Sequence, residues 1–172
     1  MQTKKKKQLQ THDMVRVWLQ TIGQEKPDSP VMLDWPTARF NADLITEETD
    51  ELIAAMESDN FTEICDGIFD SLWVITQVAM LYGIRLDHVM SAGFTSNMSK
   101  FCRTEEEAIE TINAYRDGVH PNKMGEMIET YYEKVGDLYV IRRLSDDKVL
   151  KSINFKEPDF SIITDKLIKE EV

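Results

Sequence analysis

The sequence predicts a mainly α-helical protein that ends in a small antiparallel β meander. Apolar residues recur every three or four positions through most of residues 13–120, which is typical of amphipathic helices. Capping and stop signals divide this region, for example the capping box Thr104–Glu107 and the helix-ending Gly23 and Gly83. After residue 121, runs rich in Tyr, Val and Ile alternate with turn residues such as Gly136-Asp137, which predicts strands.

Length and charge set the first limits on function. The chain has 172 residues and a net charge of −11, with an isoelectric point near 4.7. This length suits a globular core without disulfides, and the two cysteines, Cys65 and Cys102, show no metal-binding spacing. A general nucleic-acid binder needs a basic surface, so we expect no stable nucleic-acid binding.

Three regions follow from the order of these signals. Residues 1–12 form a flexible basic tail that contains Lys4–Lys7, residues 13–120 an all-α core, and residues 121–172 the meander packed on that core. No apolar stretch of seven or more residues follows the lysines, so we expect no signal peptide. We also expect that no segment is long enough to span a membrane, and that the protein is cytoplasmic. The expected strands are 130–134, 138–143 and 148–152; the first also fits a helix.

Two acidic motifs lie on consecutive predicted helices. They are Glu48-x-x-Glu51 and Glu63-x-x-Asp66, and Asp70 follows one turn after the second motif. Residues three or four apart share a helix face, and the turn at 57–60 is short enough to fold the helices into an antiparallel hairpin. The carboxylates would then converge on one region of the surface.

Converging carboxylates repel one another unless a cation lies between them. Hard oxygen ligands suit Mg²⁺, or Mn²⁺ in its place, and such sites commonly serve phosphate substrates. The alternative is that these acids form a solvated helix face, as most Glu-x-x-Glu pairs do. The second motif favours the metal because its helix is apolar nearly all round, and charges are rarely buried unless paired.

The pattern Glu47-Glu48-x-x-Glu51, then Glu63-x-x-Asp66, then Ser96-Asn97-Met98-Ser99-Lys100 resembles a known family. It is similar to the all-α nucleoside triphosphate pyrophosphohydrolases, the MazG-like and phosphoribosyl-ATP pyrophosphohydrolase-like group. The resemblance runs from about residue 34 to residue 100, and weakly through the hairpin at residues 142–152 to the C-terminus. It implies hydrolysis of a nucleoside triphosphate to the monophosphate and pyrophosphate, with Mg²⁺ held by Glu48, Glu51, Glu63 and Asp66.

The sequence departs from the family at the end of the second motif. Some members place their last acid before a Leu-Leu-aromatic run, which selects Asp70 here, and Gly67 stands where those members have Glu. The motif spacing favours Asp66 over Asp70 as the fourth ligand, and both remain candidates.

The resemblance also implies residues for substrate binding and catalysis. Asn97 and Lys100 would contact the nucleotide and its phosphates, and Lys100 would steady charge in the transition state. Glu48, or hydroxide on the metal, would take the proton from the attacking water. Arg39 either binds phosphate or pairs with a carboxylate. Trp73, Phe69 and Phe94 fit either a helix core or an apolar wall against a base.

Two helices of one chain make half of a four-helix bundle. We therefore expect a hairpin bundle completed by oligomerisation, as a homodimer or a homotetramer. A second interpretation is a non-catalytic interaction module or scaffold whose acidic face binds a basic protein. Such a module needs acidity, but it does not need Asn97 and Lys100 at their spacing.

Overall fold

The structure is a computed structural model that describes residues 10–24 and 26–167. The predicted Lys4–Lys7 tail lies outside the described residues. The described part is mainly helical, with six helices and one antiparallel pair of strands. It divides into two compact units: residues 10–87 with 161–167, and residues 88–160. Each unit has its own apolar core.

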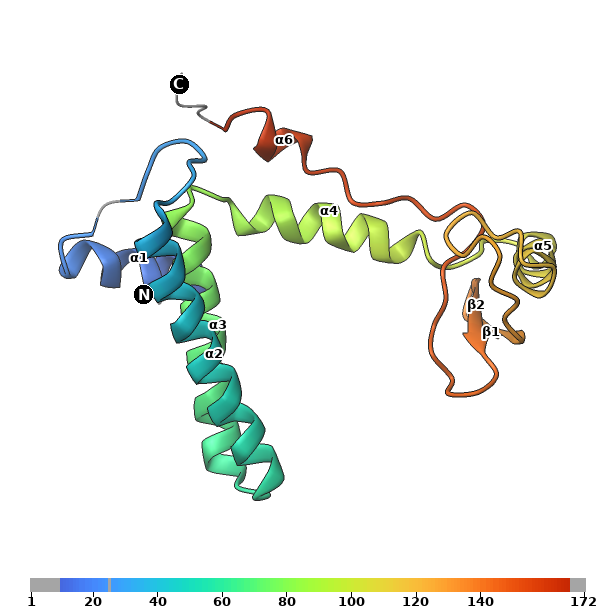
Figure 1. Cartoon of the computed structure of the whole chain (residues 1–172), viewed down its shortest axis with the longest axis horizontal. Helices are drawn as coiled ribbons and strands as arrows, with labels where there is room; N and C mark the ends of the chain where they lie inside the picture. Colours follow the sequence, from blue (N-terminus) through green and yellow to red (C-terminus); the bar gives the residue numbers. More distant parts are fainter. Residues whose placement is uncertain (1–9, 25, 168–172) are drawn as a thin grey trace, which may run out of the picture. The chain divides into compact units, whose positions relative to one another are not determined.

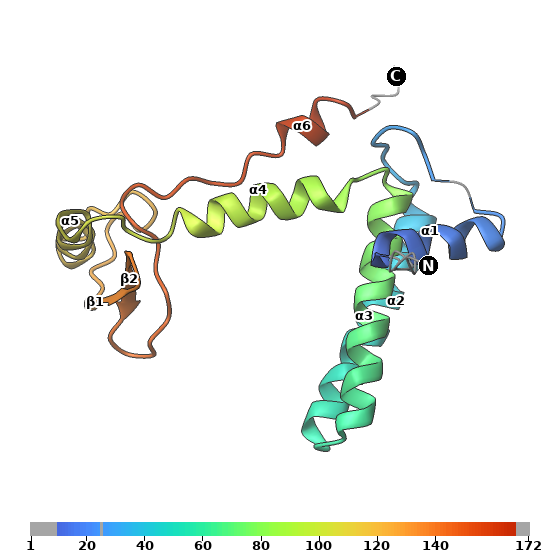
Figure 2. The same cartoon turned by 180° about the vertical axis from the view of Figure 1, so that it is seen from behind.

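The first unit is built on a helical hairpin. Helix α2 (Trp35–Glu57) and helix α3 (Phe61–Leu81) lie side by side in both views (Figures 1 and 2). Asp34 caps α2 by accepting a hydrogen bond of 2.7 Å from the Thr37 amide, and Asn60 caps α3. Asp59 adopts a positive φ of 52° in the turn between the helices. The predicted antiparallel hairpin is confirmed.

The two hairpin helices approach closely at Gly67. A Cβ atom at this position would lie 2.9 Å from the Cα of Leu52, so only glycine permits this spacing. About one turn further along α3, the buried Ser71 hydroxyl donates a hydrogen bond of 3.4 Å to the Glu48 carbonyl. These two contacts fix an antiparallel register in which Glu48 lies level with Ser71, and Leu52 with Gly67.

Helix α1 (Thr11–Thr21) packs on α3. Its fully buried Val15 and Leu19 meet Met80 and Trp73, and the Trp18 and Trp73 rings make an edge-to-face contact at 6.3 Å. Phe69 also lies against Trp73, at a centroid distance of 5.3 Å. Trp73 and Phe69 therefore contribute to helix packing.

Helix α3 is more apolar than a one-sided surface helix. Its 21 residues and a mean hydropathy of 1.4 are enough, by length and composition, to cross a membrane, so the expectation that no segment has that length is wrong. The cause is that α3 is apolar on two sides. One side packs on α1 and α2, and the other exposes Ile68, Leu72 and Ile75. The core helix of a helical bundle has the same composition.

The second unit combines most of α4 with a small α+β fold. It contains α4 (Leu86–Met98), α5 (Glu105–Arg116), β1 (Thr130–Val135) and β2 (Leu138–Arg143). The strands pair antiparallel, with Tyr132 opposite Ile141. Helix α5 packs on both strands around a core that includes Cys102, Ala108, Tyr115 and Ile141. The expected helices and the first two strands are confirmed, and a short helix α6 (Ser161–Thr164) was not predicted.

The third predicted strand, 148–152, is not present as a strand. Only a bridge between Arg142 and Val149 remains, supported by a hydrogen bond of 2.9 Å from the Leu150 amide to the Ile141 carbonyl. Beyond this point the backbone turns to other partners, because the Ser152 amide donates to the Lys100 carbonyl at 3.1 Å. The meander is therefore a two-stranded hairpin followed by a strap, which we define as residues 152–156.

The units also divide the chain differently from the regions expected from sequence. We expected a helical core up to residue 120 with the meander added to it. Instead α5 and most of α4 belong with the strands in residues 88–160. The reason is that α5 covers the sheet and shares its core, which composition along the chain does not reveal.

The contact at Gly67 gives a stability test. We expect Gly67→Ala to destabilise the first unit by about 1–3 kcal/mol, because the added methyl group meets the backbone of Leu52. The control is Gly93→Ala in α4, where nothing lies within 4 Å of the added atom. There the higher helix propensity of Ala should stabilise the second unit by roughly 0.5–1 kcal/mol. Urea unfolding followed by circular dichroism measures both, and a stabilised Gly67→Ala variant would contradict the close packing.

Candidate active site on the helical hairpin

The hairpin carries a concentrated negative charge. Residues 35–81 contain one basic side chain, Arg39, and ten acidic ones. The acids are Asp43, Glu47, Glu48, Asp50, Glu51, Glu57, Asp59, Glu63, Asp66 and Asp70. Like charges at this density oppose folding unless they are spread over the surface or balanced by a cation.

Glu48 is at the centre of this charge. It is half-buried at the α2–α3 interface, next to the Ser71 contact. Burial raises the pKa of its carboxyl group above the usual value, and the charges of Asp70, Glu51, Glu47 and Asp66 raise it further. The hairpin thus brings three of the other four predicted metal ligands into electrostatic range of Glu48: Glu51, Asp66 and Asp70.

Asp70 and Asp66 differ in their relation to Glu48. Asp70 is half-buried, directly precedes Ser71, and exerts the largest charge effect on the pKa of Glu48. Asp66 is exposed and exerts the smallest of the four effects. The geometry therefore favours Asp70 as the nearer neighbour of Glu48, whereas the motif spacing favours Asp66.

Glu63 lies apart from this group. It is exposed in the first turn of α3, and its amide donates to the Asn60 side chain at 3.4 Å. The hairpin register places it level with Met56, two turns or about 12 Å along the axis from Glu48. Glu63 is not among the groups that raise the pKa of Glu48.

Arg39 forms an ion pair within α2. Its guanidinium binds the Asp43 carboxylate through Nη2 at 2.7 Å and Nε at 3.0 Å, and both side chains are exposed. Asp43 in turn raises the pKa of Arg39. Of the two roles expected for Arg39, the structure contains the carboxylate pair, although its partner is Asp43 and not a residue of the acidic motifs.

Asn97 and Lys100 belong to the second unit. They lie at the end of α4, and the Lys100 ammonium donates a hydrogen bond of 2.7 Å to the Asn97 side-chain oxygen. The two side chains therefore lie next to each other. In the part of the chain that the structure describes, Lys100 has no ion pair with a carboxylate.

Comparison with known proteins identifies the helical segment. Residues 15–93 match the family described as PRA-PH, phosphoribosyl-ATP pyrophosphohydrolase. This segment, 79 of the 172 residues, is similar to that family. The family belongs to the MazG-like nucleoside triphosphate pyrophosphohydrolase superfamily, so the resemblance drawn from the acidic motifs is confirmed. It indicates a hydrolase that acts on nucleotides.

One curated relative matches beyond this segment. It is an uncharacterised protein of Acanthamoeba polyphaga mimivirus, 30% identical over 119 residues. The match covers 69% of this chain and 47% of the viral protein, so the chain spans about half the length of that relative. The PRA-PH match contains all five acids and Arg39, and it ends before Asn97 and Lys100.

The donor chemistry of the segment that matches the PRA-PH family fits a hard divalent cation. Every candidate ligand is a carboxylate, which Mg²⁺ prefers. The raised pKa of Glu48 reflects first its burial and then the nearby negative charge, which a cation would balance. As they stand, no three Asp, Glu, His or Cys side chains in residues 10–24 and 26–167 are close enough to hold a metal. The carboxylates of the hairpin would have to change rotamer to close around one.

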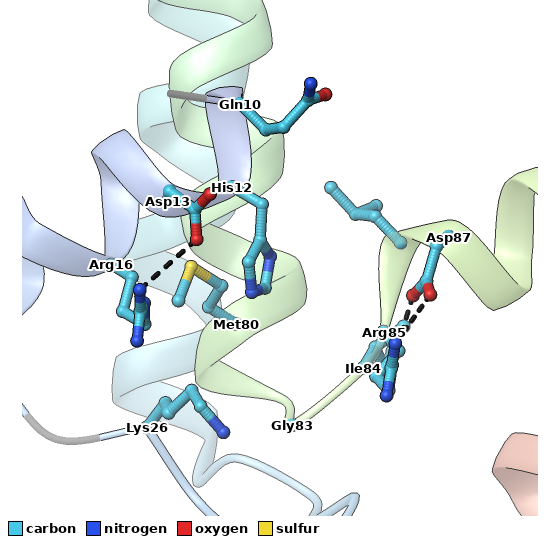
Figure 3. A pocket seen from close by; sticks show the side chains of 11 residues that line it. Gln10, His12, Asp13, Arg16, Lys26, Met80, Gly83, Ile84, Arg85 and Asp87 are labelled. Atoms are coloured by element: carbon cyan, nitrogen blue, oxygen red, sulfur yellow. Dashed lines mark hydrogen bonds and ion pairs between the residues drawn. The ribbon is translucent and has the colours of Figure 1, made fainter. Parts of the chain in front are cut away.

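A separate pocket in the first unit involves none of these acids. It has a volume of about 570 Å³ and lies beside the start of α1 and the loop after α3 (Figure 3). Its Arg16 and Arg85 are already paired with Asp13 and Asp87, at 3.2 Å and 2.6 Å. Lys26 also lines this pocket, but none of the acids of the two motifs does, so the pocket does not replace the acidic hairpin as the candidate site.

Three serines that support the predicted residues were not expected from the sequence. Ser71 links α3 to the backbone of Glu48, while Ser96 and Ser99 bind the strap. Ser71 directly follows Asp70, and Ser96 and Ser99 lie inside the motif Ser96–Lys100. The sequence therefore shows that these serines are near candidate site residues, but it has no pattern that shows which backbone group a hydroxyl contacts.

Proposed function

We propose that this protein is a Mg²⁺-dependent nucleoside triphosphate pyrophosphohydrolase. It cleaves the bond between the α and β phosphates and releases a nucleoside monophosphate and pyrophosphate. The observation that carries the proposal is the half-buried Glu48 surrounded by Asp70, Glu51 and Asp66 in the segment that matches the PRA-PH family. Mn²⁺ would serve in place of Mg²⁺, because both accept carboxylate ligands.

Glu48, Glu51, Asp66 and Asp70 would hold the metal, with Glu63 as a further candidate ligand. When bound, Mg²⁺ supplies positive charge for the phosphates and lowers the pKa of a bound water. Asp70 has the stronger support as the fourth ligand, because it exerts the largest charge effect on Glu48. Within one hairpin, Glu63 lies too far along α3 to join Glu48 at the metal. It would become a ligand if a second copy of the chain placed the first turn of its own α3 beside Glu48.

The protein's own groups would move the proton and bind the phosphates. The raised pKa of Glu48 makes its carboxylate a stronger proton acceptor than an ordinary glutamate, which suits a general base. Lys100 carries a charge not neutralised by a carboxylate in the described part of the chain, and Asn97 holds its ammonium in one direction. In this proposal Lys100 binds phosphate oxygens and steadies developing charge. Asn97 contacts the nucleotide. Arg39 would bind phosphate only by leaving Asp43.

The homodimer is also part of the proposal. Phe61, Cys65, Ile68, Leu72 and Ile75 are all exposed and follow one another at alternate spacings of four and three residues. This is the spacing of a helix–helix seam, and it supports pairing of α3 with the hairpin of a second copy. Two hairpins joined in this way would form a four-helix bundle, and two dimers a homotetramer.

Activity measurements test the proposed reaction. Pyrophosphate release should be measured with and without Mg²⁺ on canonical ribonucleotides and deoxyribonucleotides and on phosphoribosyl-ATP. We expect Mg²⁺-dependent turnover that falls by more than about 100-fold in Asp70→Asn, because a lost metal ligand costs more than a supporting group. Asp50→Asn, an exposed acid on α2 that does not act on Glu48, should retain activity. No turnover on any nucleotide would favour the acidic interaction module instead.

The oligomer has its own test. Leu72 is 55% exposed at the middle of the apolar stripe, and Leu72→Glu should convert a dimer or tetramer to monomers in sedimentation experiments. The control is Ile109→Glu, which changes an equally apolar side chain, 47% exposed, on α5 of the second unit. A wild-type chain that sediments as a monomer, or a Leu72→Glu variant that remains dimeric, would contradict pairing through α3.

A further inference from the structure

A second pocket lies wholly within the second unit. Its volume is about 480 Å³, and it lies between α4, the segment after α4, and the strap. Phe94, Met98 and Phe101 give it an apolar wall, while Arg103, Asn154 and Lys156 supply polar groups. Pockets of this size hold small organic molecules, and an apolar wall with a few polar groups is their usual lining.

Hydrogen bonds hold the two sides of this pocket together. The Ser96 hydroxyl donates to the Lys156 carbonyl at 2.8 Å, and the Lys156 amide donates to the Ser99 hydroxyl at 2.9 Å. The Ser152 hydroxyl, which is fully buried, donates to the Ser99 carbonyl at 2.9 Å. The strap is thus fixed to α4 by buried or half-buried serines, so the pocket is a built feature of the unit.

The pocket carries positive charge that the described protein does not balance. Seven arginines lie in the described residues, and all except Arg103 form an ion pair with a carboxylate. Lys156 likewise has no ion pair in this part of the chain. The pocket's own acid, Glu107, accepts hydrogen bonds from the backbone amide of Arg103 at 2.8 Å and from the side-chain amide of Asn154 at 3.0 Å. These donors are neutral, so Glu107 keeps its negative charge, and Arg103 and Lys156 together leave the lining with a net positive charge.

The apolar wall is also open to a ligand. Phe94 is 65% exposed and Phe101 is half-buried. Both rings line the pocket beside the strap, whose backbone is hydrogen-bonded to α4. Among the described residues, the Phe94 ring packs against no other aromatic ring, whereas Trp73 and Phe69 contact one another. An exposed ring beside two unpaired cations is the combination that binds an aromatic anion, because the ring stacks and the cations bind the charge.

We infer that this pocket binds a nucleoside monophosphate, with the base against Phe94 and Phe101 and the phosphate at Arg103 and Lys156. The choice of a nucleotide among aromatic anions rests on the proposed function, whose product is a nucleoside monophosphate. Asn154 has an amide oxygen with no hydrogen-bond partner in the described protein, and it is placed to accept a hydrogen bond from the base. The pocket gives the second unit a nucleotide-binding role of its own.

Calorimetric titration of the full chain in EDTA tests this inference. The probes are AMP, GMP, CMP and dTMP, with adenosine and ribose 5-phosphate as half-ligands. We expect at least one monophosphate to bind once per chain, about tenfold or more tighter than either half-ligand, because stacking and phosphate contacts both contribute. Arg103→Gln and Phe94→Ala should each weaken binding by about tenfold or more. Arg116→Gln, which removes a surface arginine paired with Asp117, should leave it unchanged.

Lys156→Gln provides a second variant, because it removes the charge but keeps the backbone hydrogen bonds of the strap. Circular dichroism checks that each variant is folded.

The inference is overturned if no monophosphate binds, if Arg103→Gln and Lys156→Gln both bind normally, or if only Asp70→Asn abolishes binding. The two proposals fail separately. A chain without hydrolytic activity that still binds through Arg103 contradicts the proposed reaction alone, and an active chain without this binding contradicts the pocket alone.

Discussion

The contact between α2 and α3 at Gly67 and Ser71 is the constraint on which the candidate site depends. Because Gly67 has no side chain, the backbone of α3 approaches Leu52, and Ser71 reaches the carbonyl of Glu48. This register brings Asp70 opposite Glu48 and half-buries both carboxyl groups. The raised pKa of Glu48 follows from that packing, so the electrostatics of the hairpin are a consequence of how closely its helices lie.

The same packing accounts for the departure from the family at position 67. A glutamate there would have to fit between two helices that are already in contact, so it could not extend a carboxylate toward Glu48 without separating them. Asp66 and Asp70 flank this position on α3, and both act on Glu48. The acidic surface thus retains two carboxylates from each helix, with Glu48 and Glu51 on α2.

Much of the helical part was predictable because its signals are local. Thr104 with Glu107, Asp34 before Pro36, and the short turn at 57–60 each act within a few residues, and the corresponding helices and hairpin are present. The third strand was not predictable, because Ser152 leaves the sheet to bind Lys100 and Ser99, about 50 residues away. Glu63 shows the same limit at the site, since helical spacing gives its face but not its level along the partner helix.

The most direct measurement of the central claim is an NMR titration of the Glu48 side-chain carboxyl carbon, assigned from its loss in Glu48→Gln. In the metal-free protein the pKa should lie above the usual glutamate value, and Asp70→Asn should lower it more than Asp66→Asn does. Because a raised pKa makes ionisation costly to the fold, stability should fall as pH rises through the interval between the ordinary and raised values. Mg²⁺ should lower the apparent pKa. A pKa at the ordinary value, unchanged by Asp70→Asn and by Mg²⁺, would contradict a carboxylate cluster on this hairpin.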